Sequence, residues 1–220
     1  MSLSIAMIKS VSRPLLVLSV LVIGGTLAVV LALRQPTGRF AESWEGGRRT
    51  ITVGRKDSLQ SAINAAQYGD TIILEAGASY TGSFVLPPKS GTGEIIIQSS
   101  RVSELPEGVR VNPSQSALLA RIQSATPAEP VVKTVAGAHH YRFAGIEFST
   151  STASVVVYDL IRFGESRHTQ TTLSSVPHHL VIDRCYIHGF DTQDVQRGVS
   201  LNSAESTVSN SYISKIHGVG

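Results

Sequence analysis

The chain has 220 residues, of which 42% are hydrophobic and 16% are charged, and its net charge is +3. This composition excludes an intrinsically disordered protein, and the length allows one ordinary domain with an appendage. The excess positive charge lies in residues 1–40, which carry four basic side chains and no acid, whereas the remaining residues carry 15 basic and 16 acidic ones. The folded part therefore lacks the basic surface of nucleic-acid-binding proteins, and we expect no nucleic-acid partner.

The N-terminal region consists of a basic tail (residues 1–13), an uncharged apolar run (residues 14–33) and a linker rich in glycine and charged residues (residues 34–49). Twenty residues in a helix span the ~30 Å hydrocarbon layer of a bilayer. We expect a transmembrane helix or signal anchor over 14–33, with the membrane as its partner. The alternative is a signal peptide that is cleaved on export, although its apolar core is usually shorter.

A short amphipathic helix is predicted after a strand at residues 50–53. Asp57 and Gln60 have the spacing of a capping box at a helix N-terminus. Apolar residues then recur on one helical face, at Leu59, Ala62, Ile63 and Ala66. A single helix ahead of many strands is typical of the cap that covers the end of a solenoid.

Short β-rich segments follow, bounded by glycine, proline, serine or threonine, at residues 71–75, 83–86, 94–98 and 117–122. They have no helices between them, which excludes βαβ units, and no Asn-Gly hairpin turns. Strands that wind in one direction, each pairing with the next coil, explain both observations.

A six-residue unit occurs three times, at residues 143–148, 182–187 and 208–213, with offsets of 39 and 26 residues. Each copy has an apolar residue, a two-residue turn, and then small or apolar positions. Periods of 20–50 residues mark solenoids, and strands joined by two-residue corners mark a β-solenoid.

The second corner position holds Gly145, Arg184 and Asn210 in the three copies. Glycine and asparagine are the residues that most easily adopt left-handed backbone. The pattern therefore predicts a left-handed residue at each corner, with a strained backbone at Arg184.

Residues 58–74 and 80–82 resemble the N-terminal cap and first coil of right-handed parallel β-helix proteins of the pectin lyase-like (pectate lyase) superfamily. Residues 180–189 and 208–213 look like the repeating rungs of that fold. The resemblance covers about residues 50–220. It implies an all-β domain over these residues that corresponds to the N-terminal portion of the fold and is incomplete at its C-terminus.

The resemblance implies a carbohydrate-active protein that is membrane-tethered or exported, with its β-helix at the cell surface or in the periplasm, or secreted after signal cleavage. If the protein is an enzyme, the expected classes are polysaccharide lyase, often dependent on Ca²⁺, and glycoside hydrolase. The alternative is a non-catalytic surface, structural or adhesin-like module, because the fold alone does not determine an activity. The sequence leaves the oligomeric state open.

Four residues are candidates for site chemistry. Asp191 and Asp194 lie in the loop after Gly189, where side chains can face a groove. There they could act as a carboxylate pair or as part of a Ca²⁺ shell. Arg184 and Arg197 have the forked guanidinium that binds a uronate carboxylate. Against these roles stand ordinary solvated loop charges and surface arginines, and the nearby Asp183 fits a corner residue.

Two His-His pairs precede predicted strands, at residues 139–140 and 178–179. In a solenoid such recurrence predicts stacked ladders. A histidine metal site would need a third ligand and held tautomers. Cys185 is the single cysteine, so it forms no intramolecular disulfide, and its place in the repeat predicts burial.

Overall fold

The chain forms two compact units, Met1–Arg39 and Phe40–Gly220, and the computed structural model describes within them residues 16–23, 26–33, 40–45, 48–165 and 169–218. The basic tail at residues 1–13 and much of the predicted linker lie outside the described residues.

The described part of the first unit is a pair of antiparallel strands, β1 (Leu16–Ile23) and β2 (Thr26–Leu33), with Leu16 opposite Leu33. The structure thus differs from the helix predicted over residues 14–33. The run is rich in valine, isoleucine and threonine, and these β-branched residues favour extended backbone. No helix in the described part of the chain is both long and apolar enough to cross a membrane.

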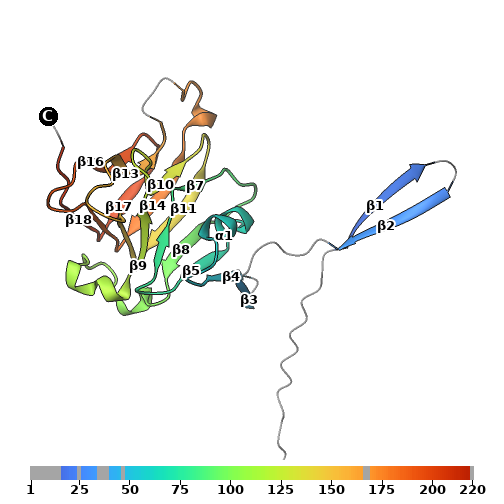
Figure 1. Cartoon of the computed structure of the whole chain (residues 1–220), viewed down its shortest axis with the longest axis horizontal. Helices are drawn as coiled ribbons and strands as arrows, with labels where there is room; N and C mark the ends of the chain where they lie inside the picture. Colours follow the sequence, from blue (N-terminus) through green and yellow to red (C-terminus); the bar gives the residue numbers. More distant parts are fainter. Residues whose placement is uncertain (1–15, 24–25, 34–39, 46–47, 166–168, 219–220) are drawn as a thin grey trace, which may run out of the picture. The chain divides into compact units, whose positions relative to one another are not determined.

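Three mainly parallel sheets build the second unit (Figure 1). In spatial order, the seven-stranded sheet contains β17 (Thr207–Ser209), β14 (His178–Asp183), β11 (His139–Ala144), β8 (Ile95–Ser99), β5 (Thr71–Leu74), β4 (Arg48–Val53) and β3 (Ala41–Glu45). The five-stranded sheet contains β18 (Tyr212–Ser214), β15 (Tyr186–His188), β12 (Ile146–Thr150), β9 (Ala120–Ser124) and β6 (Ser79–Thr81). The four-stranded sheet contains β16 (Val195–Leu201), β13 (Val157–Phe163), β10 (Val132–Thr134) and β7 (Phe84–Leu86).

From β5 onward the chain visits the seven-, five- and four-stranded sheets in rotation. Each circuit forms one coil: β5–β7, β8–β10, β11–β13 and β14–β16, with β17 and β18 beginning a fifth. Every strand pairs in parallel with its counterpart in the next coil. The predicted all-β class and the parallel pairing between successive coils are therefore confirmed.

Part of the predicted linker is also strand, because β3 pairs antiparallel with β4. The described side chains of β3, from Ala41 to Trp44, are exposed. An edge strand of this kind is held by backbone hydrogen bonds and leaves no hydrophobic alternation in the sequence.

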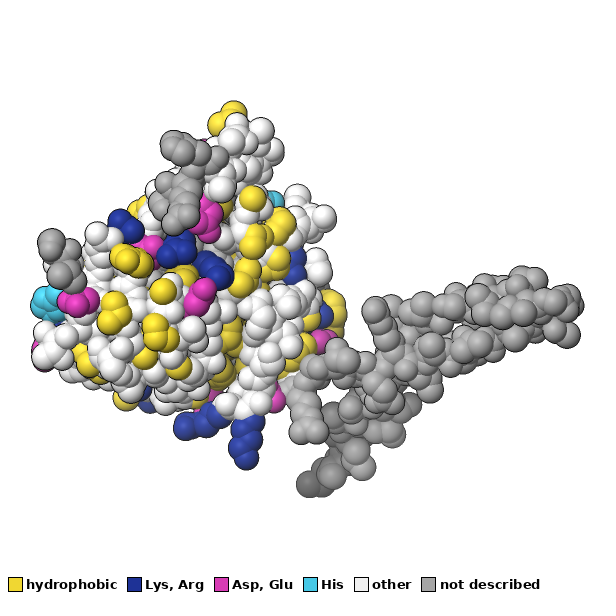
Figure 2. Space-filling model, turned by 45° about the horizontal axis from the view of Figure 1, so that its top comes forward, with side chains coloured by type: hydrophobic (Ala, Val, Ile, Leu, Met, Phe, Trp, Pro, Cys, Tyr) yellow, Lys and Arg dark blue, Asp and Glu magenta, His cyan; other side chains and the backbone are white. Residues whose placement is uncertain are grey.

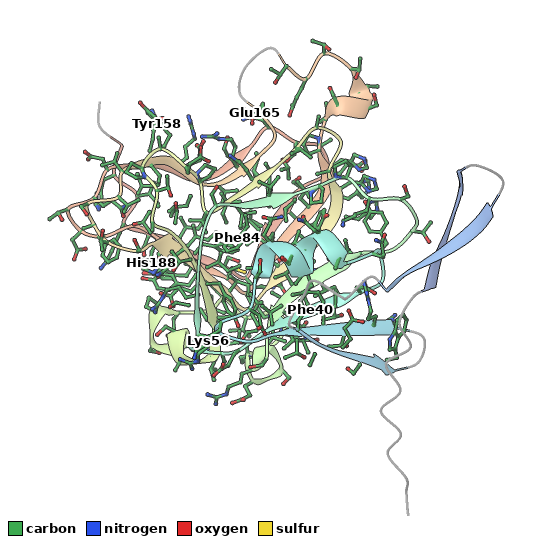
Figure 3. All side chains as sticks on the ribbon, turned by 45° about the vertical axis from the view of Figure 1, so that its right-hand side comes forward. Phe40, Lys56, Phe84, Tyr158, Glu165 and His188 are labelled. Carbon is green, nitrogen blue, oxygen red and sulfur yellow. The ribbon has the colours of Figure 1, made fainter. Side chains whose placement is uncertain are left out.

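Helix α1 (Leu59–Ala65) lies against β4 and β7 and buries Leu59, Ala62 and Ile63. Its N-cap is Ser58, whose side chain accepts a hydrogen bond from the Ser61 N–H, so the predicted capping box is wrong. The Gln60 side chain instead donates to Val85 O (2.9 Å) and accepts from Val85 N (2.8 Å). These bonds give partners to backbone groups of β7, which is an edge strand of its sheet. Figure 3 shows Phe84 of β7 beside this helix. In the described residues, 3₁₀ helices span Val102–Glu104, Pro113–Leu118 and Leu173–Ser175.

The core is a set of stacked apolar rows inside the coils. In the seven-stranded sheet, register pairs place Ile72, Ile97, Phe143, Ile182 and Val208 in one row, and the first four are fully buried. Full burial of such a side chain contributes about 1.5–3 kcal/mol, so the rows supply the main stabilisation.

The corners between the seven- and five-stranded sheets have the predicted backbone. Gly145, Arg184 and Asn210 have φ values of 65°, 49° and 49°. Asp183 accepts hydrogen bonds from Asn210 Nδ2 (2.9 Å) and Ser209 Oγ (3.2 Å) of the next coil. The repeat in the sequence is therefore the recurring corner of a coil.

Candidate functional site

A buried carboxylate between two arginines marks the outer face of the four-stranded sheet. Asp159 on β13 is 3% exposed. Its register partner Arg197 on β16 donates from Nε to Oδ1 at 2.5 Å, and Arg162 on β13 donates from Nε to Oδ2 at 2.9 Å. Both carboxylate oxygens are thus engaged, as a buried charge requires. Arg197, predicted as a ligand-binding residue, is positioned by Asp159.

The two arginines keep donors for a ligand. Among the described residues, the Nη groups of Arg162 and Arg197 have no hydrogen-bond partner, because both side chains use only Nε on Asp159. The Arg162 side chain is 23% exposed and that of Arg197 is 46% exposed. A guanidinium with free Nη groups can bind a carboxylate or several hydroxyls.

Lys133 extends this basic row to a third coil. It lies on β10 as the register partner of Arg162, and its Nζ donates to Glu129 Oε2 at 2.7 Å. This hydrogen bond lowers the pKa of Glu129. Neighbouring strands lie about 4.8 Å apart, so the three strands that carry these side chains span roughly 10 Å, with Arg197 three residues before Ser200, the register partner of Arg162. Figure 2 shows Lys and Arg side chains gathered beside acidic and hydrophobic ones on one face of the unit.

A groove of about 490 Å³ is formed in part by the residues that precede Asp159 and Arg197 in the chain, and it is lined by Pro127, Ala128, Val156, Val157, Tyr158, Asp194 and Gln196. Tyr158 precedes Asp159 in the chain and is 62% exposed (Figure 3). Apolar walls with a few hydrogen-bonding groups are the usual composition of a ligand site. The row Lys133–Arg162–Arg197 together with this groove is named the arginine groove.

Asp191 and Asp194, predicted as a pair, have different surroundings. Asp194 lines the arginine groove, whereas the exposed Asp191 forms an ion pair with Lys215 (3.2 Å). Within the described residues, neither belongs to a group of three or more side chains placed to hold a metal ion. Their role as carboxylate pair or Ca²⁺ ligands stays a prediction.

Arg184, the other predicted arginine, lies at a corner. Its Nε donates to Asp183 Oδ2 (2.8 Å) and its Nη1 to Leu105 O (3.2 Å). Burial raises the pKa of Asp183, but hydrogen bonds from Asn210 and Arg184 outweigh this effect and lower it overall. These contacts give Arg184 and Asp183 a structural role at the corner.

The five-stranded sheet carries a second buried carboxylate. Glu147 accepts from Arg121 at both oxygens (2.9 and 3.1 Å), and His188 Nε2 lies 3.0 Å from Oε1. Burial raises the pKa of Glu147, but the hydrogen bonds to His188 and Arg121 lower it by more, so the pKa is lowered overall.

Sequence reasoning missed Asp159 and Glu147 as site residues. Each lies inside an apolar strand, and that interruption is the one signal in the sequence that could have singled them out. Apart from Arg162, which is three residues from Asp159, their partners lie 26 to 41 residues away, so the strand register brings these partners together.

Cys185 and the histidine pairs lie where they were predicted. Cys185 is fully buried, and burial raises the pKa of its thiol to about 12. His139 stacks on His178 and His140 on His179, with ring centroids 4.8 and 4.5 Å apart. The predicted ladders are therefore confirmed.

Comparisons with known proteins do not assign the chain to a family. No family model matches the sequence, and no curated protein matches it. Among solved structures, the chain is similar to the crystal structure of alginate lyase from Paenibacillus sp. str. FPU-7, with 16% sequence identity and a TM-score of 0.40. The similarity covers 64% of this chain and 45% of that one. A similarity of this size supports no inference about activity.

Proposed function

We propose that the Phe40–Gly220 unit is a right-handed parallel β-helix of the pectin lyase-like kind, and that it binds an acidic polysaccharide in the arginine groove. The rotation of the chain through three parallel sheets supports the β-helix class. Parallel crossover connections are right-handed in nearly all proteins, which supports the handedness.

The observation that carries the binding proposal is that the Nη groups of Arg162 and Arg197 have no hydrogen-bond partner in the described part of the chain. Asp159 fixes the orientation of both guanidinium groups before any ligand arrives, which lowers the entropy cost of binding. A uronate carboxylate matches the planar fork of arginine. The exposed ring of Tyr158 offers an apolar face for a sugar ring at the adjoining groove.

Binding is better supported than cleavage. Both oxygens of Asp159 accept hydrogen bonds from arginine, so this carboxylate is not placed to take a proton from a sugar. In the described part of the chain, no buried side-chain nitrogen or oxygen lacks a hydrogen-bond partner. A lyase or hydrolase activity would have to use exposed groups such as Asp194, with Ca²⁺ as an added ligand in the lyase case.

Isothermal titration calorimetry of the full chain with polygalacturonate, alginate and neutral dextran tests the proposal. We expect binding to the two polyuronates and not to dextran, weakened about tenfold or more in Arg197→Gln and Arg162→Gln. Arg142→Gln is the matched control, because Arg142 on the seven-stranded sheet is paired with Glu94 through Nε and Nη2. Equal binding by all variants, or none by the wild type, would reject the proposal. Ultraviolet absorbance of unsaturated products, with and without Ca²⁺, reports any lyase activity.

We also propose that the apolar run at residues 14–33 places the compact unit on the outer side of the cytoplasmic membrane. The support is the run itself, with a basic tail before it and a separate compact unit after it. Protease treatment of intact cells that express the chain checks this placement. Digestion of the Phe40–Gly220 unit is expected, and its survival in intact cells but not in lysed ones would contradict the proposal.

A further inference from the structure

Four histidines and one glutamate meet where the chain passes from the four-stranded to the seven-stranded sheet. His139 and His140 begin β11, His178 and His179 begin β14, and Glu205 occupies the same place before β17. His140, His179 and Glu205 all have left-handed backbone, with φ values of 55°, 52° and 49°. The cluster therefore joins three successive coils at one corner.

Nitrogen atoms of three of these imidazoles lie close to one another. Ligand atoms of His140, His178 and His179 all lie within 4.8 Å of one another. The Nδ1 atoms of His178 and His179 are 2.7 Å apart, so in the metal-free protein a proton lies between them. In a tetrahedral site with bonds of 2.0–2.1 Å, ligand atoms lie about 3.3 Å apart. The His179 side chain is 48% exposed, which leaves room for the ring to adjust when an ion binds.

Partners outside the group of three hold the tautomers. Glu205 Oε2 lies 2.6 Å from His179 Nε2, which keeps the proton on Nε2 and makes Nδ1 the acceptor of the hydrogen bond from His178 Nδ1. On the other side, His140 Nδ1 lies 2.8 Å from His139 Nδ1, and the latter is 2.8 Å from Tyr68 Oη. Carboxylate–histidine pairs of this kind orient the ligands in many zinc sites.

We propose that His140, His178 and His179 bind one divalent transition-metal ion, with Glu205 as the positioning residue for His179. Imidazole nitrogens suit Zn²⁺, Cu²⁺ and Ni²⁺ better than Ca²⁺ or Mg²⁺. Three protein ligands leave a fourth position for water.

Such an ion would connect the coil of β11 to the coil of β14. The site lies apart from the arginine groove, because none of its ligands lines that groove. The proposal is therefore independent of polysaccharide binding, and either one can fail without the other.

Calorimetric titration of the EDTA-stripped full chain, purified without a polyhistidine tag, with ZnCl₂ tests the site. We expect one ion per chain and loss of binding in His178→Gln and in His179→Gln. Glu205→Gln should weaken the affinity about 10–100-fold, as removal of an outer carboxylate partner does elsewhere. His217→Gln is the matched control, since His217 is exposed and outside the cluster.

Titration with Co²⁺ gives a second readout, because its visible absorption bands report tetrahedral nitrogen coordination. Binding that persists in the His178→Gln/His179→Gln double variant, or its absence in the wild type, would overturn the proposal. Unchanged affinity in Glu205→Gln would remove Glu205 from it. Circular dichroism checks that each variant is folded. Should His178→Gln lose the native spectrum, the exposed positions His179 and Glu205 decide the outcome.

Discussion

Loss of both arginine partners of Asp159 is expected to cost far more stability than the sum of the single losses. In Arg197→Met or Arg162→Met, the remaining arginine still pairs with the buried carboxylate. Because both side chains are partly exposed, each single change should cost about 1 kcal/mol, at the upper end for solvent-accessible pairs. Arg162→Met should cost the more, since Arg162 is the less exposed of the two.

The double variant leaves Asp159 buried without a counter-charge. Breaking a buried pair in this way costs about 3–5 kcal/mol, so the two changes should be non-additive by roughly 1–3 kcal/mol. Adding Asp159→Leu to the double variant removes the stranded charge and should restore most of the stability, because a buried ion cluster and an apolar replacement are often equivalent.

Urea unfolding of the full chain, followed by circular dichroism, measures these differences as shifts of the midpoint at constant slope. Additive costs for the two single variants would refute the shared role of Asp159. Failure of the triple variant to recover would show that Asp159 contributes more than its charge pairing.

Three further predictions concern the corner, the second carboxylate and the thiol. Gly145→Ala should lower the free energy of unfolding by about 1–3 kcal/mol more than Gly77→Ala does. Both glycines have left-handed backbone, but an added Cβ meets side-chain atoms at 3.2 Å at Gly145 and nothing within 4 Å at Gly77. Equal urea midpoints for the two variants would contradict this crowding. The lowered pKa of Glu147 stabilises the fold above its ordinary value of 4.5, and this stability is lost as the pH falls through the folded-state pKa; acidification should therefore shift the midpoint of Glu147→Gln less than that of the wild type. Cys185, with its pKa raised to about 12, should react with a thiol reagent only after unfolding, and rapid reaction of the native protein would contradict its burial.

The parts of the fold that depend on local backbone chemistry could be predicted from the sequence. The corner residues Gly145, Arg184 and Asn210 recur because each coil needs a left-handed residue at the same place. Helix α1 could be predicted from its apolar face, but its N-terminus could not. The chain uses Gln60 to pair with β7, a contact 25 residues away that no local pattern reports.

The candidate site could be predicted only in part, because it depends on register. Asp194 is a sequence candidate because it lies in a loop after a predicted strand, and Arg197 because its guanidinium can bind a carboxylate. Their relation to Asp159 follows from the pairing of β13 with β16, and a shift of one residue would move these side chains to the other face. The third residue of the proposed metal site, His140, could not be recognised either, since the sequence shows two pairs and the structure stacks one on the other.

An ion pair alone does not distinguish a binding site from a device that fixes register between coils. Each of the three sheets carries at least one carboxylate bonded to arginine, at Asp183, Glu147 and Asp159. The hollow beside Asp183 has no aromatic side chain in its wall, and its two arginines, Arg142 and Arg184, each use both Nε and one Nη group on protein oxygens.

Arg121, beside Glu147, likewise bonds both carboxylate oxygens, through Nε and Nη2. At Asp159 the geometry differs, because two arginines share one carboxylate through Nε and keep both Nη groups free of described partners next to an exposed tyrosine. Both Nη groups are thus available to a ligand carboxylate there, whereas at the other two sheets each of these arginines already has one Nη group bonded to the protein. Polyuronate binding should accordingly be sensitive to Arg197 and Arg162 and insensitive to Arg184.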